Sequence, residues 1–337
     1  MSESLVHAAA GAAGGCVAMA ITYPLISVST RAQVETKRHP GETTLDSIRR
    51  FVAKEGIAGL YDGLSSSLLA IAVTNGAFYA FYEESRTLIA NYKAKRERSS
   101  ITSAAASLSM LESILASFLA GSATSIISNP IWVINTRQTV RTTVSDPQKA
   151  DARDPKTGRP VMVKKLGFAA TLKHIIQTDG PGALFNGLGP ALLLVANPII
   201  SYTAFEQMKN LLLTRRAAKA SQSATGSPLA ALPLTDLDFF ALGALSKLLS
   251  TGFTYPWLTV KSRMQSGQAQ GRSYKSTFHG ITSIIQSEGP AGLYRGISTK
   301  LLQSVLTNAF LFMSKERFYL LVKSLILTLS VRKNVAA

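Results

Sequence analysis

Lys247 is the residue whose position most strongly suggests chemistry. It interrupts a largely apolar segment, residues 239–265, nine residues before Pro256. If this segment crosses a membrane, a charge near its middle is costly, and such charges usually face a cavity and bind a ligand. A phosphate would satisfy the ammonium as a point charge. Lys300 lies nearer a segment end, where a lysine can also extend its amine to the membrane surface, so both interpretations stay open for it.

Three asparagines each precede a glutamate by eight or nine residues, namely Asn75, Asn197 and Asn308. On helices they would form a ring at one level. Amides can read the edge of an adenine and tyrosines can stack on its face, although asparagines in membranes also form plain interhelical hydrogen bonds. The candidate substrate-binding residues are therefore Lys247, Asn75, Asn197, Asn308, Gln303, Ser304, Lys300 and Tyr79.

Catalysis and metal binding find no support in the sequence. The four histidines show no ligand spacing, and no P-loop lysine follows the glycines near the N-terminus, so we predict neither an enzyme, nor a metal site, nor a cofactor. The net charge of +17 suggests an anionic ligand or anionic lipid. No nucleic-acid-binding motif accompanies this charge, so nucleic acid is not an expected partner.

The chain contains three copies of one sequence unit. In each copy an arginine follows a proline by seven residues. A second motif comes after it, which begins with an acidic residue and a glycine and ends with another glycine eight residues after the acid. The three copies of this motif span residues 55–63, 179–187 and 288–296. A third motif, which contains Glu83, Glu206 or Glu316, lies about twenty residues further on. We predict repeats at residues 1–95, 108–215 and 235–325. The proline-to-glycine spacings of 39, 57 and 40 place an insertion in the middle repeat, at about residues 142–160, which we expect to be a loop.

Each unit is predicted to form a long helix, a short helix and a second long helix. The predicted elements are 6–33, 44–54 and 64–82, then 111–137, 168–177 and 188–205, then 239–265, 277–286 and 298–313. The long segments can cross roughly 30 Å of hydrocarbon. A proline within the first helix of each unit should kink it. We therefore predict an all-α membrane protein with six transmembrane helices in three pseudo-symmetric repeats, since a water-soluble helical solenoid would be less apolar and less glycine-rich.

These motifs resemble those of the mitochondrial carrier family over nearly the whole chain. The resemblance implies alternating access around one central site, with a short helix of each repeat on the matrix side. Such carriers usually have Pro-x-acid-x-x-base at the kink, where the charges close a matrix gate. Here the acidic positions hold Ile26, Trp132 and Leu258, and the basic positions hold Ser29, Asn135 and Lys261. The implied matrix-gate and kink residues are Pro24, Arg31, Pro130, Arg137, Pro256, Lys261 and Arg263, which would act through packing and hydrogen bonds.

The implied gate on the cytosolic side retains more charge. By family geometry Glu83 would pair with Lys209 and Glu316 with Arg86, whereas Glu206 would face Tyr319 and form at most a hydrogen bond. The alternative is that these residues form ordinary ion pairs within one helix.

Three stretches resemble the peroxisomal nucleotide carriers, namely residues 129–137, 242–247 and 300–307. The resemblance implies a multi-pass peroxisomal membrane protein that imports ATP in exchange for AMP or ADP and so supplies fatty-acid activation and β-oxidation. We expect a functional monomer with membrane lipid and a small anionic nucleotide as its partners. A carrier of CoA, FAD or NAD, in the peroxisome or the mitochondrial inner membrane, and a transport-inactive interaction protein remain alternatives. Leu193 and Leu194 stand where adenine-nucleotide carriers usually have a Gly-aliphatic pair.

Overall fold

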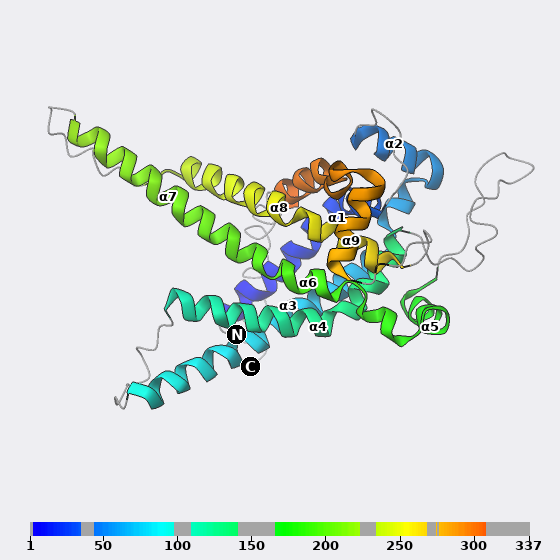
Figure 1. Cartoon of the computed structure of the whole chain (residues 1–337), viewed down its shortest axis with the longest axis horizontal. Coiled ribbons are helices and arrows are strands. Elements are labelled where there is room, and N and C mark those ends of the chain that lie inside the picture. Colours follow the sequence, from blue (N-terminus) through cyan, green and yellow to red (C-terminus); the bar gives the residue numbers. More distant parts are fainter. Residues whose placement is uncertain are drawn as a thin grey trace, which may run out of the picture. The chain divides into compact units, whose positions relative to one another are not determined.

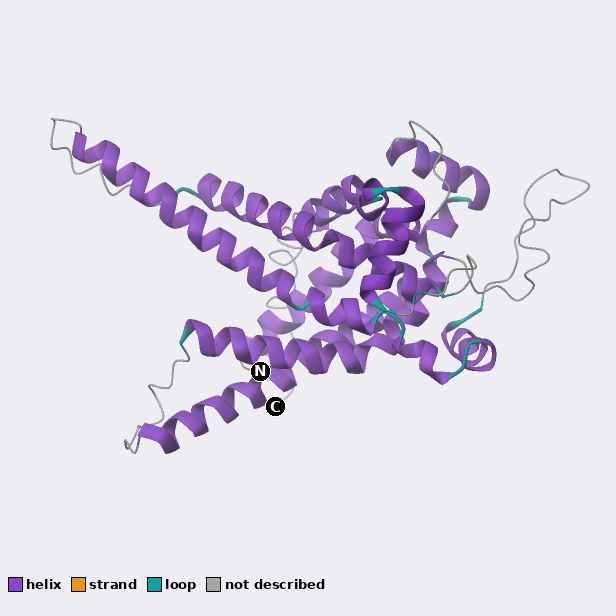
Figure 2. Cartoon of the chain, viewed as in Figure 1, coloured by secondary structure: helices purple, strands orange, loops and turns teal. Residues whose placement is uncertain are grey.

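The computed structural model describes residues 3–34, 44–97, 109–140, 166–222, 234–267, 274 and 276–307. Within these ranges every regular element is a helix and no strand occurs (Figure 2). The all-α prediction is therefore confirmed. The predicted insertion at 142–160, Asn308, Glu316 and Tyr319 lie outside the described residues.

One order of elements recurs three times: a long helix, a short helix, a 3-10 turn and a second long helix (Figure 1). The first set is α1 (Glu3–Val34), α2 (Thr44–Glu55), η1 (Ile57–Tyr61) and α3 (Leu64–Glu97). The second is α4 (Met110–Val140), α5 (Phe168–Thr178), η3 (Pro181–Phe185), α6 (Leu188–Leu194) and α7 (Ala196–Gln222). The third is α8 (Asp236–Ser266), α9 (Thr277–Glu288), η5 (Pro290–Tyr294) and a helix over residues 297–307, where the description ends.

The glycines of the acid-Gly motif explain why the short helices end where they do. Gly56, Gly180 and Gly289 have φ angles of 72°, 82° and 74°, and the motif-ending glycines Gly63, Gly187 and Gly296 have 82°, 77° and 76°. Residues with a Cβ rarely adopt this left-handed conformation, so glycine is the natural choice at all these positions. The sequence repeat is thus a repeat of backbone geometry.

Two differences from the predicted elements have simple causes. The predicted helix at 188–205 is divided into α6 and α7, because Pro198 lacks an amide hydrogen and its ring conflicts with the carbonyl of Leu194, where α6 ends. The helices α3 and α7 also run well past residues 82 and 205. Apolarity marks only the part of a helix suited to hydrocarbon, whereas charged helix formers can continue the same helix into water.

Within the part of the chain that the structure describes, three stretches are long and apolar enough to cross a membrane: Ile57–Tyr92, Leu111–Val140 and Pro181–Ala218. These stretches contain three of the predicted long helices, at residues 64–82, 111–137 and 188–205. The other three predicted spans remain predictions. Pro24, Pro130 and Pro256 lie inside the continuous helices α1, α4 and α8, as expected.

The chain divides into two compact units, which we describe separately. The first comprises residues 1–68, 134–174 and 295–337, and the second comprises residues 69–133 and 175–294. In the second unit α7 packs along α8 (Figure 1). A small core of Val260, Ile284 and Leu293 joins α8 to α9 and η5 there.

Candidate functional site: two polar clusters at the prolines and a lysine site on α8

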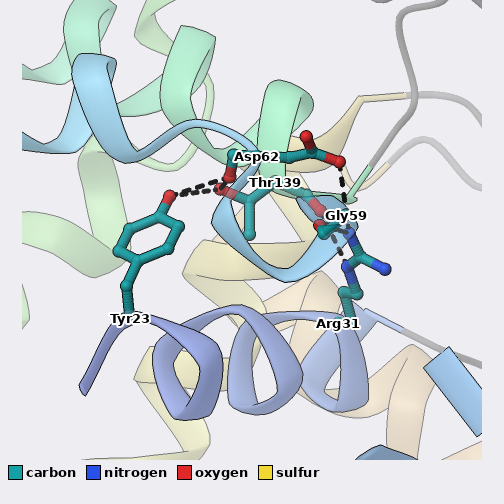
Figure 3. A network of polar contacts seen from close by, with 5 residues as sticks. All are labelled: Tyr23, Arg31, Gly59, Asp62 and Thr139. Atoms are coloured by element: carbon teal, nitrogen blue, oxygen red, sulfur yellow. Dashed lines mark hydrogen bonds and ion pairs between the residues drawn. The ribbon is translucent and has the colours of Figure 1, made fainter. Parts of the chain in front are cut away.

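In the first unit, Tyr23 connects three segments of the chain next to Pro24 (Figure 3). Its hydroxyl donates to the backbone carbonyl of Asp62 at 2.9 Å and lies 3.3 Å from Oγ1 of Thr139. The ring is fully buried and stacks on Tyr61. Tyr23 therefore fixes the C-terminal part of α4 and the turn before α3 against α1 with neutral groups only.

Asn135 holds the start of α3 in the same unit. Its Nδ2 lies 2.8 Å from the Gly63 carbonyl, 3.0 Å from Oγ of Ser66 and 2.7 Å from Oγ of Ser67. Ser29 occupies the equivalent position in α1, and its hydroxyl lies 3.4 Å from the Gly296 carbonyl. Two of the three positions where the resemblance leads us to expect a base, Ser29 and Asn135, thus bind backbone carbonyls at motif-ending glycines.

Arg31 secures the end of α1. Its Nε donates to the Thr139 carbonyl at 2.9 Å, and one terminal nitrogen donates to the Gly59 carbonyl at 3.0 Å and lies 3.8 Å from Asp62 (Figure 3). The guanidinium also lies over the ring of Phe51, on α2. This arginine is buried and therefore anchors the end of its repeat.

The second unit repeats this design with different side chains. Asn129 precedes Pro130, as Tyr23 precedes Pro24, and its Nδ2 donates to the carbonyls of Leu184 and Asn186 at 2.9 and 3.2 Å. Nε2 of Gln265 donates to Oδ1 of Asn129 at 3.2 Å and so connects α8 to α4. Arg263 forms a two-pronged ion pair with Glu288, at 2.7 and 2.8 Å. Arg137, the corresponding arginine of α4, belongs to the first unit and is also buried.

Sequence reasoning missed Tyr23, Asn129, Thr139 and Gln265. The sequence did contain a signal for these residues. A residue able to form a hydrogen bond precedes each of the three prolines, and an amide or hydroxyl residue stands nine positions after each proline. The partners were harder to find, because most are backbone carbonyls, which leave no trace in residue types. The predicted matrix-gate residues lie in or beside these two clusters, and most of the hydrogen bonds there that join one repeat to another are neutral, the bond from Arg31 to the Thr139 carbonyl being charged. Their role as a gate stays a prediction.

A separate polar cluster lies on α7 and α8 in the second unit. Nζ of Lys247 donates to Oδ1 of Asn197 at 3.1 Å. Nδ2 of Asn197 in turn donates to Oγ1 of Thr254 at 2.6 Å and to the Ser250 carbonyl at 3.2 Å. Lys247 and Asn197 are half-buried. Two residues predicted independently from sequence are thus in contact, and the ammonium retains donors for an anion.

The other predicted substrate residues are not all brought together. Asn75 and Tyr79 are exposed on α3 in the second unit. Gln303, Ser304 and Lys300 belong to the first unit, where Nε2 of Gln303 donates to Oγ1 of Thr307 at 2.9 Å. Thr307 also contacts Thr22 of α1, at 2.9 Å between the hydroxyls. A role for these residues in binding stays a prediction.

The four described charges of the predicted cytosolic gate pair within their own helices in this conformation. Glu83 lies 3.7 Å from Arg86 on α3, and Glu206 lies 2.7 Å from Lys209 on α7. The Glu83 and Arg86 side chains are 67% and 50% exposed, so this pair is weak. Pairing between helices remains a prediction for a different conformation.

Three structural repeats, long apolar helices and a half-buried lysine held by an amide are the features of a helical membrane carrier. The family model described as mitochondrial carrier protein matches residues 2–93, 106–216 and 234–324, and the chain belongs to this family. The peroxisomal nicotinamide adenine dinucleotide carrier of Arabidopsis thaliana is 35% identical over 343 aligned positions, with 98% of both chains covered. Peroxisomal membrane protein PMP47B of Candida boidinii is 30% identical, with 96% of this chain and 88% of the relative covered. Peroxisomal membrane protein PMP34 of Mus musculus is 29% identical, with 94% and 92% covered.

Proposed function

We propose that this carrier exchanges adenine nucleotides across the peroxisomal membrane, importing ATP in return for AMP or ADP for fatty-acid activation and β-oxidation. The observation that carries the proposal is the Lys247 ammonium, which is held by the neutral Asn197 at 3.1 Å. Within the described part of the chain no carboxylate pairs with Lys247. A half-buried cation without a counter-ion favours an anionic ligand, and the phosphates of a nucleotide supply one.

The peroxisomal location is supported by the names of three relatives, from Arabidopsis thaliana, Candida boidinii and Mus musculus, each of which is called peroxisomal. Microscopy of a tagged full-length chain beside peroxisomal and mitochondrial markers tests it. We expect overlap with the peroxisomal marker, and overlap with the mitochondrial marker alone would reject the location.

Reconstitution of the purified protein in liposomes tests the cargo. With AMP inside, we expect uptake of labelled ATP that depends on the internal nucleotide, and Lys247→Ala should abolish it while the protein still inserts. Lys173→Ala is the matched control, because Lys173 is an exposed lysine of α5. The absence of ATP/AMP exchange by the wild-type protein would reject an adenine-nucleotide antiporter.

NAD is the second candidate, because the Arabidopsis thaliana relative at 35% identity is named a nicotinamide adenine dinucleotide carrier. NAD also carries phosphates that Lys247 could bind. Competition of unlabelled NAD, CoA and FAD against ATP in the same liposomes separates these cargoes. A transport-inactive interaction protein would instead show no exchange of any of them, and its interactions would tolerate Lys247→Ala.

A further inference from the structure

Lys261 is a second cation on α8 that the proposed function does not use. It is half-buried, whereas Val260 and Ser262 on either side are buried. Among the residues that the structure describes, no carboxylate forms an ion pair with Lys261 and no side chain hydrogen-bonds to it. A positive charge held in this environment without a counter-ion is costly, so its presence calls for an anionic partner.

The neighbouring arginine shows how a purely structural cation looks on the same helix. Arg263 is bound by both oxygens of Glu288, and the two side chains are only 2% and 5% exposed. Its charge is therefore neutralised inside the protein. Lys261 is more exposed than Arg263 and has no such partner among the described residues, so the demands of folding do not explain its charge.

Lys261 lies on the same face of α8 as the Lys247 cluster. Lys247, Thr254 and Lys261 recur every seven residues, so the two lysines are about 40° apart around the helix axis and roughly 21 Å apart along it. The Lys247 amine does not stay at the level of its own backbone. It contacts Asn197, whose amide reaches Ser250 and Thr254, so the amine is directed along α8 toward Lys261.

We propose that Lys261 binds the terminal phosphate of a nucleoside di- or triphosphate whose first phosphate is bound at Lys247. Thr254 lies two helical turns from Lys261, or about 10 Å along the axis, a distance that an extended polyphosphate and two flexible lysine side chains can bridge. Lys261 would then determine specificity by the number of phosphates, with little effect on a monophosphate. This inference rests on the proposed nucleotide transport.

The test compares AMP, ADP and ATP as substrates of the full-length protein in liposomes. For Lys261→Gln we expect the apparent KM for ATP to rise roughly ten- to hundredfold, the range for losing a charge-assisted hydrogen bond, and that for AMP to change less than about twofold. Lys261→Arg, which keeps the charge, should preserve most of the preference for ATP. Lys173→Gln serves as the control for loss of a positive charge at an exposed site.

Each outcome decides a different point. Equal KM changes for AMP and ATP in Lys261→Gln, or no change in either, would overturn the role of Lys261 while nucleotide transport by the wild type stands. Absence of uptake by the wild-type protein overturns the proposed function and this inference together. If Lys261→Gln inserts but does not transport, the test is how far tripolyphosphate raises the unfolding temperature of the purified protein. A smaller rise for Lys261→Gln than for the wild type supports the inference, and an equal rise rejects it.

Discussion

Single residues in this carrier replace charge by hydrogen bonds to backbone. Tyr23, Asn129 and Asn135 each donate to the carbonyl of a residue next to, or at, a motif-ending glycine. Neutral hydrogen bonds of this kind contribute about 1 kcal/mol each, less than a well-placed buried ion pair can. They need close backbone approach, which the glycines permit.

Replacing Gly63 by alanine should therefore disturb the first cluster. A Cβ there would lie 2.8 Å from Oγ1 of Thr139 and 3.0 Å from the Tyr23 hydroxyl, at a φ of 82°. We expect a loss of about 1–3 kcal/mol from backbone strain alone, measured as a lower temperature of unfolding in detergent. Gly76→Ala is the matched control, because Gly76 lies within α3 with nothing near its Cβ position and should be neutral or stabilising. Equal effects of both changes would contradict the packing argument.

Asn197 permits a second test at this scale. Asn197→Asp keeps the size of the side chain and its contact with Lys247, but its carboxylate would form an ion pair with the ammonium and so compete with an anionic substrate. We expect the apparent KM for ATP to rise by roughly ten- to hundredfold, with the protein still inserted, and Asn197→Gln to have a smaller effect because it adds no charge. Uptake by Asn197→Asp at the wild-type affinity would show that the Lys247 charge does not bind substrate.

At the scale of elements, the third repeat is fastened by the contact of α8 with the end of α9. Arg263 and Glu288 make this contact through an almost fully buried ion pair. Glu288→Gln would leave the Arg263 charge without its partner inside the protein, so we expect a loss of about 3–5 kcal/mol in the free energy of unfolding. The apolar double variant Arg263→Met/Glu288→Leu should recover much of this loss, because it removes both charges.

Thermal or chemical unfolding in detergent measures both variants. Arg86→Gln is the comparison, because it breaks an exposed ion pair that is worth under about 1 kcal/mol. If Glu288→Gln were no more destabilising than Arg86→Gln, the ion pair would add nothing to the apolar contact that joins α8 to α9.

For the whole molecule, the sequence predicted the periodic features well and the contacts less well. The three spacings placed α2, α5 and α9 within a few residues, since helical period and glycine conformation are local properties. The contact between Lys247 and Asn197 followed from no local pattern, because the two residues are fifty positions apart. Depth in an apolar segment singled out Lys247, and the spacing before Glu206 singled out Asn197, but only the packing of α7 on α8 shows that the two residues meet.

Alternating access requires the whole molecule to adopt a second conformation, and the charges on α3 and α7 indicate how to detect it. Glu83 and Glu206 are paired here with bases on their own helices. We predict that Glu83 and Lys209 pair with each other when the carrier closes toward the cytosol, since a conformation is favoured only by contacts that differ between the two states. The variant Glu83→Cys/Lys209→Cys, in a Cys16→Ser background that removes the single native cysteine, reports on this approach.

Disulfide formation in this variant should increase when substrate is present on both sides of the liposome membrane, because the proposed exchange would then carry the protein repeatedly through the closed state. Glu84→Cys/Lys209→Cys is the control, because residue 84 points about 100° away from residue 83 around α3. Equal crosslinking of both pairs would indicate loose helices in place of a defined contact. If crosslinking in Glu83→Cys/Lys209→Cys did not change with substrate, Glu83 and Lys209 would have no role in the transport cycle. Their only pairs would then be those within single helices.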